Sequence, residues 1–106
     1  LKVTDDQGSI SGENITKALK WVIKNQEKYN IRIINLSVTD DWSTSYRENA
    51  VDQAIARAVA AGIVVVVAAG NDENAYLKAP ANSPHAISVG GLDDHNTLHP
   101  LSYTLY

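Results

Sequence analysis

The stretch from Ile63 to Asn71 constrains the fold more than any other part of this chain. Seven apolar residues, most of them β-branched, run without interruption from Ile63 to Ala69, and Gly70 and Asn71 follow. A strand that is apolar on both faces is typical of the interior of a parallel sheet. In open α/β sheets, ligands bind where the strands end at their carboxyl side. The position of Asn71 therefore makes it the first candidate for a functional residue.

Helices and strands alternate along the rest of the chain. An apolar stripe predicts a helix from an N-cap at Ser11 to about Lys28, whose lysines are interpreted as a solvated face. A capping box that starts at Ser45 predicts the beginning of a second helix, and Gly62 is placed to end it. Further strands are expected at residues 31–36 and 86–89, with residues 1–3 as the end of another. This order predicts an α/β protein with a three-layer parallel sheet flanked by helices, in Rossmann-like order.

Composition excludes several classes of function. The chain has 9 basic and 12 acidic side chains, so its net charge is −3 and we expect no nucleic-acid partner. No apolar run approaches the ~18 residues of a membrane-spanning helix, so no membrane partner is expected. Without cysteine, the chain has no disulfide, no thiolate zinc site and no cysteine nucleophile. The lack of cysteine fits either the cytoplasm or a protein secreted by a bacterium, so the compartment stays open.

The residues alone leave two interpretations of Asn71 open. Asparagine is a frequent turn former and helix cap, because it tolerates a left-handed backbone and caps amides. Its side-chain amide is also a donor that can stabilise a developing negative charge, as in an oxyanion hole.

No metal site or cofactor is identified, since Asp93, Asp94 and His95 are adjacent and would point apart in an extended chain. The sequence also contains no G-x-S-x-G motif and no glycine-rich phosphate loop.

An ordered set of short motifs resembles the central catalytic-domain segment of the subtilisin-like serine proteases, the subtilase family. The matching pieces are Leu1-Lys2-Val3, the helix with Trp21, Ile34-Asn35-Leu36-Ser37, Ala61-Gly62-Ile63, Ala68-Ala69-Gly70-Asn71, Ala79-Pro80-Ala81 and Ala86-Ile87-Ser88-Val89-Gly90. The finer likeness is to bacterial members of the family.

The resemblance implies a serine endopeptidase that hydrolyses peptide bonds in a peptide or protein substrate. Asn71 matches the asparagine of the family's oxyanion hole. The walls of the substrate cleft are implied to be Ser37, Val38 and Thr39 on one side and Ala68, Ala69 and Gly70 on the other. Thr39 stands where the family usually has glycine, which implies a narrower or differently shaped pocket entrance. Members often bind structural calcium, which the parent protein could share, but no complete calcium site can be placed in these residues.

The Ser/His/Asp triad of the family has no counterpart in this sequence. We therefore interpret residues 1–106 as a partial catalytic domain without its triad-bearing flanks, and we expect it to be inactive alone. The expected partners are the substrate and the remainder of the catalytic domain, with self-association of the isolated piece. The alternative is a non-catalytic α/β binding or scaffold module.

Overall fold

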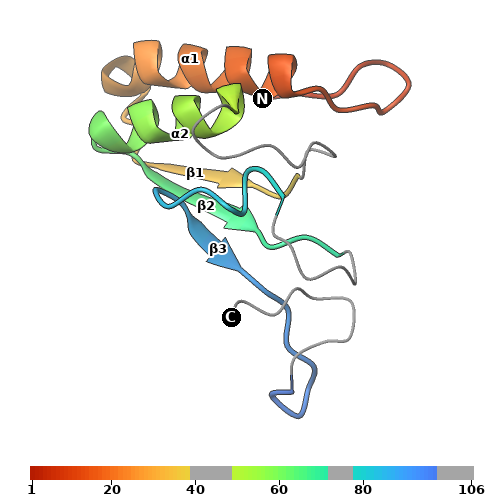
Figure 1. Cartoon of the computed structure of the whole chain (residues 1–106). Helices are drawn as coiled ribbons and strands as arrows, with labels where there is room; N and C mark the ends of the chain where they lie inside the picture. The colour runs from red at the N-terminus through yellow and green to blue at the C-terminus, as the bar shows by residue number, and fades with distance from the viewer. Residues whose placement is uncertain (39–48, 72–77, 98–106) are drawn as a thin grey trace.

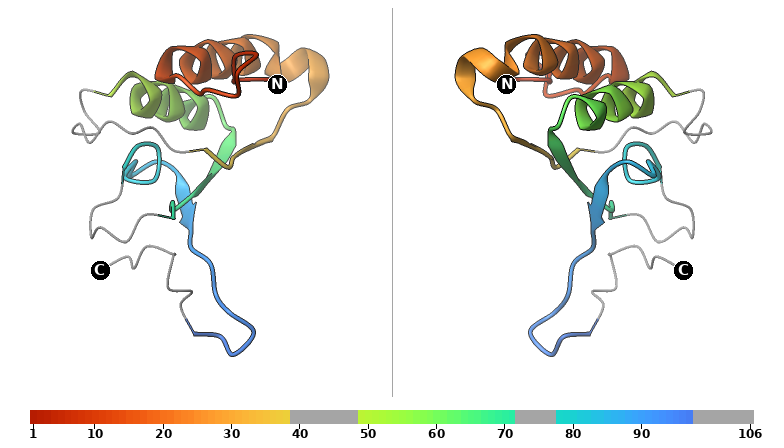
Figure 2. Two further views of the ribbon diagram at one scale, coloured as in Figure 1. Left: turned by 90° about the vertical axis from the view of Figure 1, so that its right-hand side faces the viewer. Right: turned by 90° about the vertical axis from the view of Figure 1, so that its left-hand side faces the viewer.

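Figure 1 shows the fold as a computed structural model, which describes residues 1–38, 49–71 and 78–97. The elements are α1 (Gly12–Tyr29), β1 (Ile33–Leu36), α2 (Ala50–Ala60), β2 (Val64–Ala68) and β3 (Ile87–Val89). The strands form one parallel sheet in the order β1-β2-β3, so the predicted α/β class and parallel sheet are confirmed. Both helices lie on the same side of this sheet (Figures 1 and 2). No helix in the described ranges has the length and apolar character needed to cross a bilayer.

The first helix begins and ends where the sequence predicts. The Ser11 hydroxyl accepts a hydrogen bond of 3.2 Å from the N–H of Asn14, which satisfies a donor that the first turn would otherwise leave open. The helix ends at Tyr29 because Asn30 adopts a left-handed backbone with φ of 52°. The buried side chains of its inner face are Ile15, Leu19 and Val22.

The second helix begins later than the sequence predicts. Its N-cap is Asn49, whose side-chain oxygen accepts a hydrogen bond of 2.8 Å from the N–H of Val51. The capping box that starts at Ser45 lies outside the described residues, and the prediction that it caps this helix is wrong. Asn49 is an equally good cap and stands directly before the apolar stripe. Gly62 follows the helix end with φ of 85°, as predicted for a residue that ends a helix.

The sheet buries one face and exposes the other. Ile34 pairs with Val65 and Leu36 pairs with Val67, so these four side chains share the face that packs on the helices. The large apolar side chains exposed on the opposite face are Ile33, Val64, Ile87 and Val89, at 46–66% of their surface. The expectation that the central strand is covered on both faces is therefore not met within the described part of the chain.

The strand predicted for residues 1–3 is absent from the structure. A strand needs a hydrogen-bonded neighbour, and the nearest pairing is an isolated antiparallel bridge between Thr4 and Ile10. The strands expected at residues 31–36 and 86–89 are present but shorter, at Ile33–Leu36 and Ile87–Val89.

Candidate functional site

The parallel sheet brings two predicted segments to the same edge. Ser37 and Val38 directly follow β1, and Ala68 is the last residue of β2. Because the strands are parallel and Leu36 lies opposite Val67, the next step of this register places Ser37 beside Ala68. The described residues of both predicted cleft walls therefore lie together at the carboxyl edge of the sheet. Thr39, the last residue of the first wall, lies outside the described residues.

The first wall is exposed and its hydroxyl is held in place. The side-chain amide of Asn35 donates a hydrogen bond of 3.0 Å to the Ser37 hydroxyl oxygen. Both residues are exposed, and Val38 is half-buried against the core. The wall thus offers a polar, accessible side chain that is anchored by an apolar neighbour.

The second wall presents Asn71 to solvent through a sharp turn. Ala69 is 1% exposed, and its N–H donates a hydrogen bond of 2.9 Å to the Val89 carbonyl, which ties the end of β2 to β3. Gly70 follows with φ of 101°, a backbone conformation that residues with a side chain rarely adopt. Asn71 comes next and is exposed. Its NH₂ group carries two donors, which can stabilise an anionic oxygen at this edge.

The segment at residues 79–81 packs beneath the surface. Ala79 is fully buried and Ala81 is 3% exposed, and the peptide bond between Ala79 and Pro80 is cis. The N–H of Ser83 donates a hydrogen bond of 3.1 Å to the Pro80 carbonyl, which closes the turn. This motif of the resemblance is therefore a buried support for the fold.

The described residues contain no linked Ser-His-Asp arrangement. The ring of His95 contacts Asp94, with 2.9 Å between Nδ1 and a carboxylate oxygen, and both side chains are exposed. The recorded contact of His85 with Ser83 is a backbone one, in which its N–H donates to the hydroxyl oxygen over 3.5 Å. His99 lies outside the described residues. A catalytic base is therefore not assembled within residues 1–38, 49–71 and 78–97.

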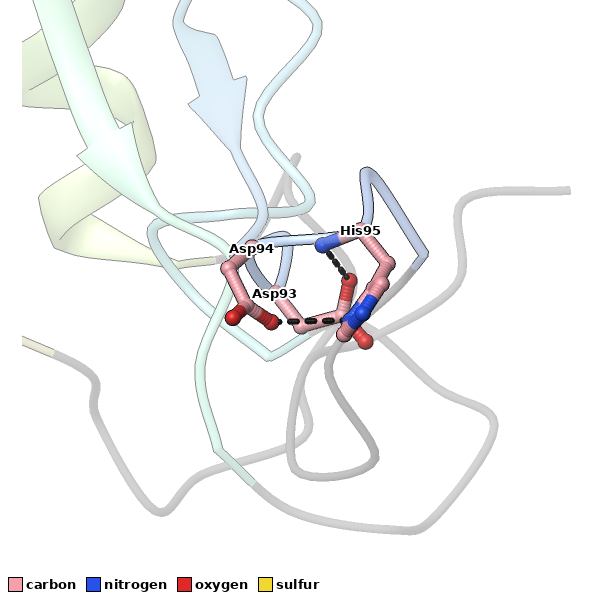
Figure 3. A group of neighbouring side chains, drawn as sticks. All are labelled: Asp93, Asp94 and His95. Atoms are coloured by element: carbon pink, nitrogen blue, oxygen red, sulfur yellow. Dashed lines mark hydrogen bonds and ion pairs between the residues drawn. The ribbon is translucent and has the colours of Figure 1, made fainter.

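Figure 3 shows Asp93, Asp94 and His95 drawn together by a turn. Each offers one ligand atom, and these atoms lie within 4.8 Å of one another, so the prediction that the side chains point apart is wrong. The chain is not extended here, because the Asp93 carboxylate accepts hydrogen bonds from the N–H groups of His95 (2.9 Å) and Thr97 (2.8 Å). These backbone bonds account for the position of Asp93.

Sequence reasoning missed one buried acid on α2. Asp52 is 2% exposed, and neither oxygen of its carboxylate has a hydrogen-bond partner within the described ranges. Burial raises the pKa of this carboxyl from its usual 3.8 to about 6, because the charged form loses its hydration. The helical repeat is a signal that could have revealed it, because Asp52 lies seven residues before the apolar-stripe residue Val59 and therefore on the same side of the helix.

The sequence of this chain is similar to that of a known family and of known proteins. The profile of the Subtilase family matches residues 1–105. A subtilisin-like protease of Coccidioides posadasii is 38% identical over 96 residues, which cover 87% of this chain and 22% of that protein. Subtilisin-like protease 2 of Arthroderma otae has the same identity and coverage. The chain thus spans about a fifth of the length of these relatives. Both relatives are fungal, so the finer likeness to bacterial members is not supported.

Solved structures share the fold. A psychrophilic protease superposes with a TM-score of 0.80 at 23% identity, and the match covers 96% of this chain and 34% of the chain of that protease. Sphericase superposes with a TM-score of 0.77 at 24% identity, with the same coverage. The fold of this chain therefore matches about a third of each of these larger structures.

Proposed function

The chain belongs to the subtilase family, and from this premise we propose that it forms part of a serine endopeptidase that hydrolyses peptide bonds. It supplies the oxyanion donor and two walls of the substrate cleft. The observation that carries this proposal is the meeting of the segments after β1 and β2 at one edge of the sheet, with Ser37 and Asn71 both exposed. Open α/β sheets bind their ligands at this edge.

The substrate in this proposal is an extended peptide that lies along the two walls. Extended peptides bind by adding main-chain hydrogen bonds to a strand, while pockets for the side chains give specificity. The small residues Ala68, Ala69 and Gly70 leave room for a substrate side chain, and Ser37 and Val38 form the opposite wall together with Thr39.

Asn71 acts in this proposal on the tetrahedral intermediate. Attack on the scissile carbonyl places negative charge on its oxygen, and a side-chain N–H already aimed at that position stabilises the charge without reorganisation. Two features support this role. The hydrogen bond from Ala69 to Val89 fixes the end of β2, and the φ of 101° at Gly70 turns the chain so that Asn71 is exposed.

We assign the nucleophile, the base and its acid partner to parts of the protein outside these 106 residues, because the triad motifs of the family are absent from the sequence. Without a nucleophile and base, an oxyanion donor has no intermediate to stabilise, so the 106-residue chain alone is inactive. The remainder of the catalytic domain covers the exposed sheet face of Ile33, Val64, Ile87 and Val89, because apolar surface of this kind needs a partner.

The test is an activity assay on the protein that carries this chain. We expect it to hydrolyse a fluorogenic peptide and to be labelled by a fluorophosphonate, a reagent that reacts with activated serine. Residues 1–106 expressed alone should do neither. If the larger protein shows neither property, the chain belongs to a non-catalytic binding or scaffold module. Turnover by residues 1–106 alone contradicts the placement of the triad outside them.

A further inference from the structure

The outer face of α1 carries a row of lysines. The residues concerned are Lys17, Lys20, Lys24 and Lys28, all exposed, and we call them the basic face. They recur at three- and four-residue spacings, so they lie along one side of the helix. The opposite side holds Ile15 and Leu19, which are buried in the core. The basic face contains four of the nine lysine and arginine residues of the chain.

The positive charge of this face is only partly neutralised. Lys17 pairs with Glu13 over 2.6 Å, and the lysine holds the pKa of the exposed Glu13 carboxyl below its ordinary value. Among the described residues, no ion pair is recorded for Lys20 or Lys24. The helix therefore carries four lysines against two glutamates, although the whole chain has a net charge of −3.

Two exposed aromatic rings lie beside the lysines. Trp21 and Tyr29 stack with 5.7 Å between ring centroids, and the Lys28 ammonium lies 5.0 Å from the Tyr29 centroid. Trp21 is 43% exposed and Tyr29 is 54% exposed. Because stacking already fixes both rings, a partner that packs on them loses less side-chain entropy on binding. Aromatic side chains are also enriched where proteins bind one another.

We propose that the basic face and the Trp21–Tyr29 pair bind an acidic protein segment in extended conformation. From Lys17 to Lys28 the helix spans about 16 Å at 1.5 Å per residue, which matches about five extended residues. Carboxylates on alternate residues of the segment pair with lysine ammonium groups, and an apolar residue of the segment packs on the two rings.

The structure favours such a segment over an anionic membrane. Interfacial helices bind lipid by burying their apolar side, and here that side is occupied by the core contacts of Ile15, Leu19 and Val22. An anionic bilayer also faces a wide area of this chain, whose 106 residues carry a net charge of −3 that the bilayer repels. A short segment touches α1 alone and so meets mainly the lysines.

The binding test uses the whole protein and an eight-residue peptide with four glutamates. A matched peptide with glutamine in place of glutamate is the control ligand. The fluorescence of Trp21 reports binding directly in a variant of this protein in which every other tryptophan, Trp42 included, is replaced by phenylalanine. We expect the acidic peptide to change this fluorescence in a salt-sensitive manner and the glutamine peptide to leave it unchanged.

Variants show where the peptide binds. Neutralising three lysines of the face (Lys20→Gln, Lys24→Gln and Lys28→Gln) should weaken binding by about 8- to 125-fold, since exposed ion pairs contribute roughly two- to five-fold each. A control variant removes the same charge elsewhere, at three exposed cations (Lys2→Gln, Arg32→Gln and Arg57→Gln), and should change binding less than two-fold. Equal weakening by both variants, or no fluorescence change with the acidic peptide, overturns the proposal. Tighter binding to vesicles of anionic lipid than to the peptide also overturns it, in favour of a membrane.

Discussion

Asp52 makes the stability of this fold depend on pH in a direction unusual for an acid. Its carboxyl is 2% exposed and burial raises its pKa from 3.8 to about 6. As pH rises from 4 to 6, the unfolded chain releases this proton before the folded chain does, so the free energy of unfolding falls. At about 1.4 kcal/mol per pKa unit, the loss amounts to about 3 kcal/mol, complete above the folded pKa of about 6. Below pH 4, both the folded and the unfolded chain hold the proton, and the cost of burying a charged carboxylate is absent.

The perturbation that tests this reasoning is Asp52→Asn, which removes the titrating group and keeps the shape of the side chain. Urea unfolding followed by circular dichroism at pH 4, 5, 6 and 7 gives the free energy of unfolding of each protein. We expect the free energy of unfolding of the variant, relative to that of the unsubstituted protein, to rise by about 3 kcal/mol between pH 4 and pH 7. The control Asp6→Asn, at a fully exposed carboxylate, should show no such gain. Parallel curves for Asp52→Asn and the unsubstituted protein refute the claim that this carboxyl is buried with no hydrogen-bond partner among the described residues.

Three further predictions address the helix cap, the turn before Asn71 and the open sheet face. Asn49→Ala should lower the free energy of unfolding, measured in urea, by about 1 kcal/mol, because α2 loses its cap. Ser45→Ala should leave this free energy unchanged; a loss with Ser45→Ala and none with Asn49→Ala would identify Ser45 as the cap. Gly70→Ala should cost about 1–2 kcal/mol, since a side chain is strained at φ of 101°, and an unchanged melting temperature would contradict that backbone conformation. Residues 1–106 expressed alone should self-associate in light scattering, because Ile33 and Val64 are 66% and 46% exposed on one face; a clean monomer at high concentration would contradict this.

Local signals in the sequence were sufficient for the elements that position the site. Ser11 caps a helix whose apolar stripe is regular, and the helix ends at Tyr29, one residue beyond the predicted end at about Lys28. The run from Ile63 to Ala69 is too apolar and too β-branched to be other than a strand, and the strand-end rule then placed Asn71 at the carboxyl edge of the sheet. These inferences depend on neighbouring residues alone, which is why they hold.

The rest depends on interactions that the sequence does not encode locally. Two cap signals precede α2 in the sequence, and the helix begins after Asn49, which stands directly before the apolar stripe. An apolar run shows that both faces of β2 avoid water but does not show which element covers each face. The convergence of Asp93 and His95 results from backbone hydrogen bonds within a turn, which an extended-chain reading misses.

The central claim is that Asn71 donates to the oxyanion, and kinetics on the active protein test it most directly. Asn71→Asp keeps the oxygen that a turn needs and removes the donor, while Asn25→Ala removes an amide on α1 as the control. The magnitude is taken from subtilisin itself, where loss of one oxyanion donor lowers kcat by about 100- to 1,000-fold. We predict a fall of that size in kcat for Asn71→Asp, with KM and the melting temperature little changed. The kcat of the control Asn25→Ala should equal that of the unsubstituted protein. An unchanged kcat for Asn71→Asp would contradict the claim and leave Asn71 as a turn former.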